Sequence, residues 1–165
     1  MRDLVLLRHA QAVPAHSGGD YHRPLSLHGT QQAQQAAVNL QARAWQPDLI
    51  LTSPAVRTHQ TATLVAAVLS SPPVLQDATL YLAAPPALLD ALHALPDTVT
   101  RVMLVGHNPG ISLLAQQLHQ APAPDIILGT GQWIRLLLPA ETWKNLLPGS
   151  YEQVQNVISH MQRCR

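Results

Sequence analysis

Two histidines of the chain each follow directly on a short apolar run. Leu4–Leu7 leads into Arg8 and His9. Further along, residues 102–106 lead into His107. Continuous apolar runs of this length are typical of strands buried on both faces, and open α/β sheets bind ligands beyond the carboxyl ends of such strands. The spacing therefore predicts a site at one edge of a sheet, with an imidazole at the end of two strands.

Arginines accompany these histidines. Arg8 precedes His9, and Arg57 follows a third apolar run at 48–52. Arg23 is an outlying member of the group. A planar guanidinium can hold two oxygens of a phosphoryl group, and neutral imidazole offers a lone pair near pH 7 that neighbouring positive charges help to keep free by lowering the pKa of His9. The group predicts a pocket in which a histidine receives a phosphoryl group.

Strands and helices alternate along the chain. Apolar runs between turn residues predict strands at 3–7, 48–52, 101–106, 126–128 and 132–138. Helical spacing predicts helices at 26–44, 53–69, 86–95 and 110–119, a short one after Pro139 and a last one from Ser150. Ser26 and Ser53 are the expected N-caps of the first two helices. Residues 10–25 are irregular, and 74–82 are ambiguous, with a short strand as one interpretation.

This alternation predicts an α/β fold. We expect a three-layer α/β/α sandwich around a mostly parallel sheet, with an antiparallel strand at its edge. No repeat or break in composition marks a second domain, so residues 1–165 are expected to form a single domain. The hydrophobic share of 47% is sufficient for a substantial core.

Composition and missing motifs argue against several other classes of protein. Charged residues make up only 12% and the formal net charge is +1, so we expect neither nucleic acid nor a membrane surface as a partner. A single cysteine, Cys164, rules out an intramolecular disulfide and argues against a thiolate zinc site. No apolar stretch reaches the roughly 20 residues that span a bilayer, and a cytoplasmic location is expected.

Metal and nucleotide chemistry are also not expected. The nine histidines include no H-E-x-x-H pair, and His16, His22 and His28 have no carboxylate or cysteine at ligand spacing. No acidic cluster suits magnesium. The nucleophile motif of serine hydrolases, the Walker lysine and the triple glycine of dinucleotide-binding folds are all missing. We therefore expect a site that uses neither a metal nor a cofactor.

Four segments resemble motifs of the histidine phosphatase superfamily, which has the phosphoglycerate-mutase-like fold. Leu7–Ala10 looks like its Arg-His-Gly signature, and Thr52–Thr61 is similar to its Ser-Pro motif with a following Arg and Gln-Thr. Val105–Pro109 resembles the third motif. Arg23–Gly29 looks like the Arg-Pro-Leu segment of short phosphohistidine phosphatases of the SixA type. The four motifs follow the family's order and cover residues 4 to about 112.

The resemblance implies a role for each matching residue. His9 would be the nucleophile of a phosphatase and would become phosphohistidine during the reaction. Arg8, Arg57 and His107 would complete the phosphate pocket. Arg23 would be the additional arginine of SixA-like members.

Two features depart from the pattern of the family. Ala10 stands in place of the usual glycine and adds a methyl group near the pocket. Many members take a proton donor from a glutamate between the second and third motifs, but residues 58–106 contain no glutamate. Asp77 is the acid nearest to the expected place and is a candidate general acid, with a solvated loop carboxylate as the alternative.

The missing glutamate favours a phosphoramidate as substrate. An alkoxide leaves poorly unless an acid protonates it, whereas imidazole leaves the labile P–N bond of phosphohistidine with little help. Few residues separate Arg57 from His107, which favours an open site without a large lid. We expect a phosphohistidine on another protein, such as a histidine phosphotransfer domain, as substrate. The alternatives left open are a small-molecule phosphomonoesterase and a non-catalytic module that binds phosphoproteins.

Overall fold

The apolar runs form one six-stranded sheet in the computed structural model, which describes residues 1–119, 125–150 and 154–155. Its strands lie in the order β3-β2-β4-β1-β5-β6. They are β1 (Arg2–Arg8), β2 (Leu49–Thr52), β3 (Val74–Gln76), β4 (Arg101–Gly106), β5 (Trp133–Leu138) and β6 (Val154–Gln155). The first four in that order run parallel, β5 pairs antiparallel with β1, and β6 pairs antiparallel with β5. The predicted mostly parallel sheet with an antiparallel strand is confirmed.

The register of the parallel strands aligns their carboxyl ends. Arg8 at the end of β1 pairs with Gly106 at the end of β4. Thr52 at the end of β2 pairs with Val105 of the same β4 strand. The segments that follow these three strands therefore start side by side at one edge of the sheet, which is where ligands bind in folds of this kind.

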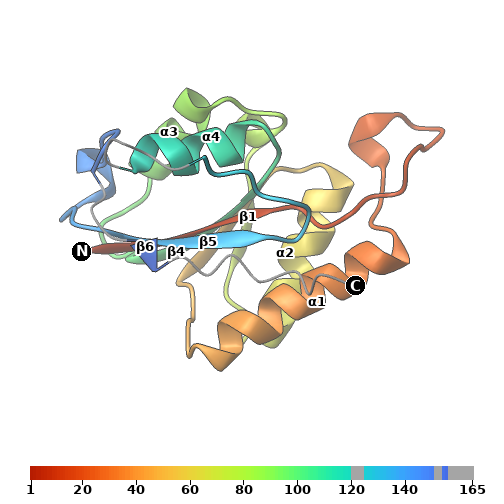
Figure 1. The fold of residues 1–165 in the computed structure, drawn as a ribbon, viewed down its shortest axis with the longest axis horizontal. Coiled ribbons are helices and arrows are strands. Elements are labelled where there is room, and N and C mark those ends of the chain that lie inside the picture. Colours follow the sequence, from red (N-terminus) through yellow and green to blue (C-terminus); the bar gives the residue numbers. More distant parts are fainter. Residues whose placement is uncertain (120–124, 151–153, 156–165) are drawn as a thin grey trace.

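The four α-helices of the described residues cover the two faces of the sheet (Figure 1). On one face lie α1 (Leu27–Ala42) and α2 (Val56–Val68), and on the other lie α3 (Pro85–His93) and α4 (Gly110–Leu118). The layers are thus helix, sheet and helix, so the predicted three-layer arrangement is confirmed.

The central strand β1 is apolar on both sides because both of its faces are covered. Val5 and Leu7 lie in the core that α1 and α2 contribute to. Leu4 and Leu6 lie in the opposite core, with α3 and α4. None of the four side chains exposes any surface. Full burial on both faces explains why the run is continuous rather than alternating with polar residues.

Two contacts fix how helices begin. The Ser26 hydroxyl accepts a hydrogen bond from the Gly29 backbone N–H at 3.0 Å, so Ser26 caps α1 as predicted. Gly110, the first residue of α4, lies so close to the chain before α3 that a Cβ atom on it would stand 1.9 Å from the Ala83 carbonyl oxygen. The two helices on this face can approach each other here only because residue 110 has no side chain.

The start of α2 differs from the prediction. Ser53 was the expected N-cap, whereas the N-cap is Ala55 and the helix begins at Val56. Ser53 keeps a strand-like hydrogen bond from its N–H to the Val105 carbonyl, at 3.4 Å, and its hydroxyl lies 2.9 Å from His107 Nε2. These two contacts hold Ser53 at the end of β2, so its hydroxyl does not cap the helix.

The predicted strand at 126–128 is absent. The Leu128 carbonyl accepts hydrogen bonds from the side chains of Arg8, at 3.1 Å, and Asn108, at 2.8 Å. Its N–H donates to the Ser112 hydroxyl. Side chains thus take up the backbone hydrogen-bonding groups of Leu128, so the segment forms a fixed loop instead of pairing as a strand.

Three short 3-10 helices complete the described structure, η1 (Asp20–His22), η2 (Ala78–Leu80) and η3 (Trp143–Asn145). The ambiguous 74–82 segment thus contains a short strand followed by η2, and the helix expected after Pro139 is η3. The last helix, expected from Ser150, falls mostly outside the described residues. Within that stretch residues 154–155 belong to β6, so the prediction of a helix is wrong there.

Candidate active site

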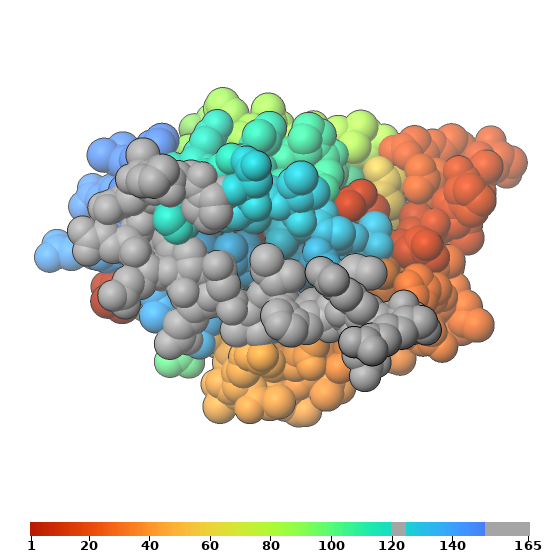
Figure 2. Space-filling view, viewed as in Figure 1, coloured from red at the N-terminus to blue at the C-terminus, as the bar shows by residue number. Residues whose placement is uncertain are grey.

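Five of the predicted site residues gather beyond the carboxyl ends of β1, β2 and β4. Arg8 ends β1, while His9, Arg57 and His107 lie in segments that follow the three strands. Arg23 lies in the 10–25 loop, which extends past the end of the sheet (Figure 1) and forms a projecting end of the molecule (Figure 2). His9, Arg57 and His107 are buried, with 8%, 3% and 3% of their surfaces exposed. Arg8 and Arg23 are partly exposed.

His9 is held in one orientation by its own neighbour. Its Nδ1 lies 2.8 Å from the carbonyl oxygen of Ala10, which can only accept a hydrogen bond. Nδ1 therefore carries the proton, and Nε2 keeps its lone pair. The Ala10 methyl group is fully buried, and the Ala10 N–H donates to the Thr61 hydroxyl at 3.0 Å. The alanine that replaces the usual glycine thus fits within the packed segment beside the nucleophile candidate.

The surroundings of His9 keep it neutral. Its pKa is lowered from 6.5 to about 4, chiefly because burial disfavours the charged ring. The positive charges of Arg57, Arg8 and Arg23 lower it further, and the hydrogen bond to Ala10 acts in the opposite sense. The sequence predicted the effect of the arginines, whereas burial turns out to be the larger cause.

His107 uses both of its ring nitrogens. Arg57 Nη2, which can only donate, lies 3.3 Å from Nδ1, so Nε2 carries the proton and donates to the Ser53 hydroxyl at 2.9 Å. Burial lowers the pKa of His107 to about 3, and the positive charge of Arg57 acts in the same direction. The His9 and His107 rings lie with their centroids 5.3 Å apart.

An aspartate that the sequence reasoning missed links two of the arginines. One Asp20 carboxylate oxygen accepts from Arg57 Nη2 and the other from Arg23 Nη1, each at 3.0 Å. Arg57 Nη1 also donates to the Asp20 backbone carbonyl at 2.7 Å. The Tyr81 hydroxyl donates to the carboxylate at 2.7 Å, and this bond together with Arg57 lowers the pKa of Asp20. The three-residue spacing from Asp20 to Arg23 was the available signal, but the irregular loop gave no periodicity with which to interpret it.

Arg8, the last residue of β1, contacts the loop before β5. Its Nη1 donates to the Leu128 carbonyl at 3.1 Å, while its Nε is buried and has no hydrogen-bond partner among the described residues. Burial lowers the pKa of Arg8. A buried guanidinium N–H without a partner is costly.

The carboxylate of the candidate acid Asp77 is bonded within its own turn. Its carboxylate accepts hydrogen bonds from the Thr79 backbone N–H at 2.8 Å and from the Thr79 hydroxyl at 2.6 Å. Asp77 is the N-cap of η2, and both contacts remain within that turn. These two hydrogen bonds show that Asp77 caps the short helix that follows it.

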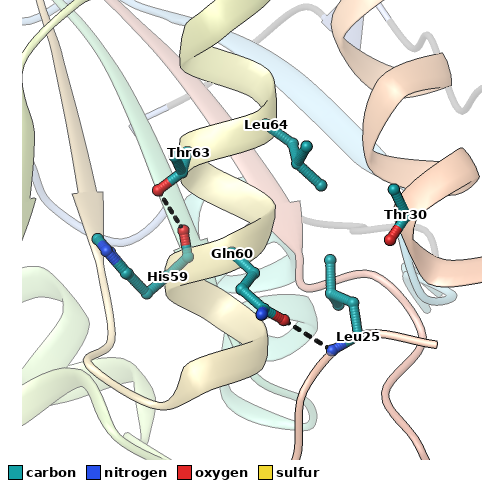
Figure 3. Close-up of a pocket in the computed structure, with 6 residues that line it drawn as sticks. All are labelled: Leu25, Thr30, His59, Gln60, Thr63 and Leu64. Atoms are coloured by element: carbon teal, nitrogen blue, oxygen red, sulfur yellow. Dashed lines mark hydrogen bonds between the residues drawn. The ribbon is translucent and has the colours of Figure 1, made fainter. Parts of the chain in front are cut away.

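A separate hollow of about 430 Å³ lies between α1 and α2 (Figure 3). Its wall includes the Gln60 side chain, which accepts from the Leu25 N–H at 2.8 Å. None of the five clustered residues lines it, so this hollow is distinct from the predicted site. Within the described ranges no three His, Cys, Asp or Glu side chains gather as a possible metal site, and no helix has the length and apolar character to cross a membrane.

Comparisons with known proteins give the same family as the motifs. Residues 4–80 match the model of the histidine phosphatase superfamily (branch 1). An uncharacterized protein of Mycobacterium tuberculosis is 29% identical over 150 residues, which cover 87% of this chain and 93% of that protein. A solved structure from Nakamurella multipartitia, assigned as a phosphohistidine phosphatase SixA, has a TM-score of 0.80 at 26% identity and covers 94% of this chain and 95% of its own. A mycobacterial glucosyl-3-phosphoglycerate phosphatase shares the fold with a TM-score of 0.66 at 20% identity, over 94% of this chain and 98% of its own.

Proposed function

The chain belongs to the histidine phosphatase superfamily and is a phosphatase, and from this premise we propose that it removes phosphoryl groups from a histidine of another protein through a phosphorylated His9. The name of the Nakamurella structure supports this substrate. Because the chain is a phosphatase, we no longer retain the alternative of a non-catalytic binding module. We further propose a cytoplasmic location, in keeping with the single cysteine of the chain.

The hydrogen bond from His9 Nδ1 to the Ala10 carbonyl is the observation that carries the proposal. It fixes the tautomer in which Nε2 can attack phosphorus, and the lowered pKa keeps that lone pair free at neutral pH. In the first step a bond forms between Nε2 and phosphorus while the P–N bond to the substrate imidazole breaks. In the second step water attacks phosphorus, which releases inorganic phosphate and restores His9.

The arginines would stabilise the charge of the transferred group. Arg8 precedes His9 in the chain, and Arg57 contacts His107, whose ring packs against that of His9. The positive charges of both arginines lower the pKa of His9. Phosphoryl transfer depends mostly on such positioning and charge stabilisation, and both are available here without a metal.

The acids near the site favour a substrate whose leaving group needs no strong proton donor. Asp20 is held as a carboxylate by two arginines and a tyrosine, and Asp77 caps a turn. An imidazole with its second ring nitrogen protonated leaves as a neutral ring, whereas an alkoxide needs a proton from the enzyme. This difference supports phosphohistidine over a sugar phosphate.

Labelling and a comparison of rates test the proposal. A phosphohistidine protein with labelled phosphorus should transfer an acid-labile, base-stable label to the wild type, and His9→Ala should lose it. His28→Ala, a change of an exposed histidine in α1, serves as the matched control and should keep the label. Rates should then be measured on the phosphohistidine protein and on a panel of phosphomonoesters. Faster hydrolysis of a sugar phosphate would favour the alternative, a small-molecule phosphomonoesterase. The glucosyl-3-phosphoglycerate phosphatase, which shares the fold of this chain, is the reason to include that alternative.

A further inference from the structure

Aromatic rings form a row that leads from the nucleophile candidate to the surface. The His107 ring lies between His9, with a centroid distance of 5.3 Å, and Tyr81, at 5.6 Å. Tyr21 follows, 5.1 Å from Tyr81. The tyrosine contacts are edge-to-face, with interplanar angles of 87° at His107 and 69° between the two tyrosines. The outer ring, Tyr21, is 36% exposed.

The chain has few aromatic residues to use in this way. Phe is missing, and there are only three Trp and three Tyr residues. All three tryptophans are buried in the cores. Tyr21 and Tyr81 are the two tyrosines in the described part of the chain, and both lie beside the site. Neither tyrosine belongs to a core, so core packing does not explain why both lie beside the site.

Hydrogen bonding fixes the ring of Tyr81 at the site. Its hydroxyl donates to Asp20 at 2.7 Å, and Asp20 is itself bound to Arg57 and Arg23. The ring of Tyr81 is therefore tied to the residues that would hold the phosphoryl group. Tyr21 packs on that ring from η1, and no hydrogen bond to the arginine network involves its hydroxyl among those found in the described chain.

We propose that Tyr21 and Tyr81 form an aromatic rim that contacts the leaving-group ring of the substrate. The inference rests on the proposed function and names the feature of this chain that selects an imidazole over an aliphatic leaving group. Aromatic rings pair favourably at centroid distances of about 4.5–7 Å, and a protonated imidazole also gains from lying over a tyrosine face. An aliphatic leaving group offers neither interaction.

Two substrates that share the P–N bond, one with an imidazole ring and one without, separate recognition of the ring from cleavage of the bond. Phosphoimidazole carries the ring, and phosphoramidate carries the same kind of bond without it. Tyr21→Leu should lower kcat/KM for phosphoimidazole about tenfold, in line with the loss of an aromatic contact, and change kcat/KM for phosphoramidate less than twofold. Tyr81→Phe should keep the preference for the ring, and Tyr81→Leu should lose it. Leu113→Ala, at an exposed position of α4, is the matched control and should alter neither rate.

The outcomes distinguish the rim from the proposed function. If the wild type cleaves both compounds and Tyr21→Leu reduces both rates equally or neither, the rim is refuted while the phosphohistidine activity stands. If the wild type cleaves neither compound but hydrolyses phosphomonoesters, the proposed substrate fails, and the rim fails with it. A loss confined to phosphoimidazole in Tyr21→Leu and Tyr81→Leu supports both.

Discussion

Acidification should leave the His9 imidazole neutral far below the pH at which an ordinary histidine takes up a proton. With its pKa lowered to about 4, roughly 97% of His9 is neutral at pH 5.5, compared with roughly 9% for a histidine of pKa 6.5. Burial is the main cause, and three nearby arginines add to it. A nuclear magnetic resonance titration of the ring protons measures this directly. The His9 signal can be assigned by its loss in His9→Asn.

The sign of the effect on stability follows from the same shift. The unfolded chain takes up a proton at His9 near pH 6.5, whereas the folded chain does so only near pH 4. The folded state is therefore favoured above pH 6.5 and loses this contribution as the pH falls from 6.5 toward 4. Between pH 7.5 and 4.5 the loss from His9 is about 2.5 kcal/mol.

Urea unfolding of the wild type and His9→Asn at these two pH values isolates that contribution. The wild type should lose about 2.5 kcal/mol more than the variant over this range, because only the wild type carries the titrating ring. Titrating groups that do not interact with His9 affect both proteins alike and cancel in the difference. A His9 signal that titrates between pH 6 and 7, or equal losses in the two proteins, would refute the reasoning that burial and the arginines hold His9 neutral.

Three substitutions test other parts of the site and fold. Asp20→Asn should bind inorganic phosphate several-fold more tightly in an inhibition assay, because it removes a carboxylate that competes with phosphate for the arginines; weaker binding would mean that this carboxylate mainly orients them. Ser53→Ala should lower the free energy of unfolding by about 1–3 kcal/mol, since it leaves the buried N–H of His107 without its acceptor, and urea unfolding would detect this. Gly110→Ala should cost about 3 kcal/mol and lower Tm by roughly 6–12 °C in a calorimetric scan, because its Cβ would collide with the Ala83 carbonyl; an unchanged Tm would contradict the close approach.

The strand ends were predictable because their signals are local. The apolar run before Arg8 and His9 is continuous because β1 is buried on both faces, and parallel strands in register must deliver the residues that follow them to one edge. Arg57 and His107 were found for the same reason. The pattern of apolar residues therefore predicts where the cluster lies.

The parts that escaped prediction depend on contacts between distant segments. Asp20 reaches Arg57 and Tyr81 from a loop without periodicity, so the sequence offered no reason to place it in the pocket. Ser53 looked like a helix cap, because the spacing of Ser-Pro before a helix is typical of one, and only the ring of His107 explains why it is not. The segment at 126–128 is apolar like a strand, but the side chains that bind its carbonyls come from elsewhere in the chain.

The central place of β1 also bears on how the protein must fold. Its hydrogen-bonding partners on either side, β4 and β5, lie far along the chain, with Leu4 opposite both Val102 and Leu136. Pairing over such separations closes long loops and is intrinsically slow. Until those strands arrive, the apolar run Leu4–Leu7 has two open edges, the state in which sheet proteins aggregate. A fragment limited to residues 4–80 would keep His9 but leave β1 without either neighbour, and it should be recovered as insoluble material rather than as a weakly active enzyme.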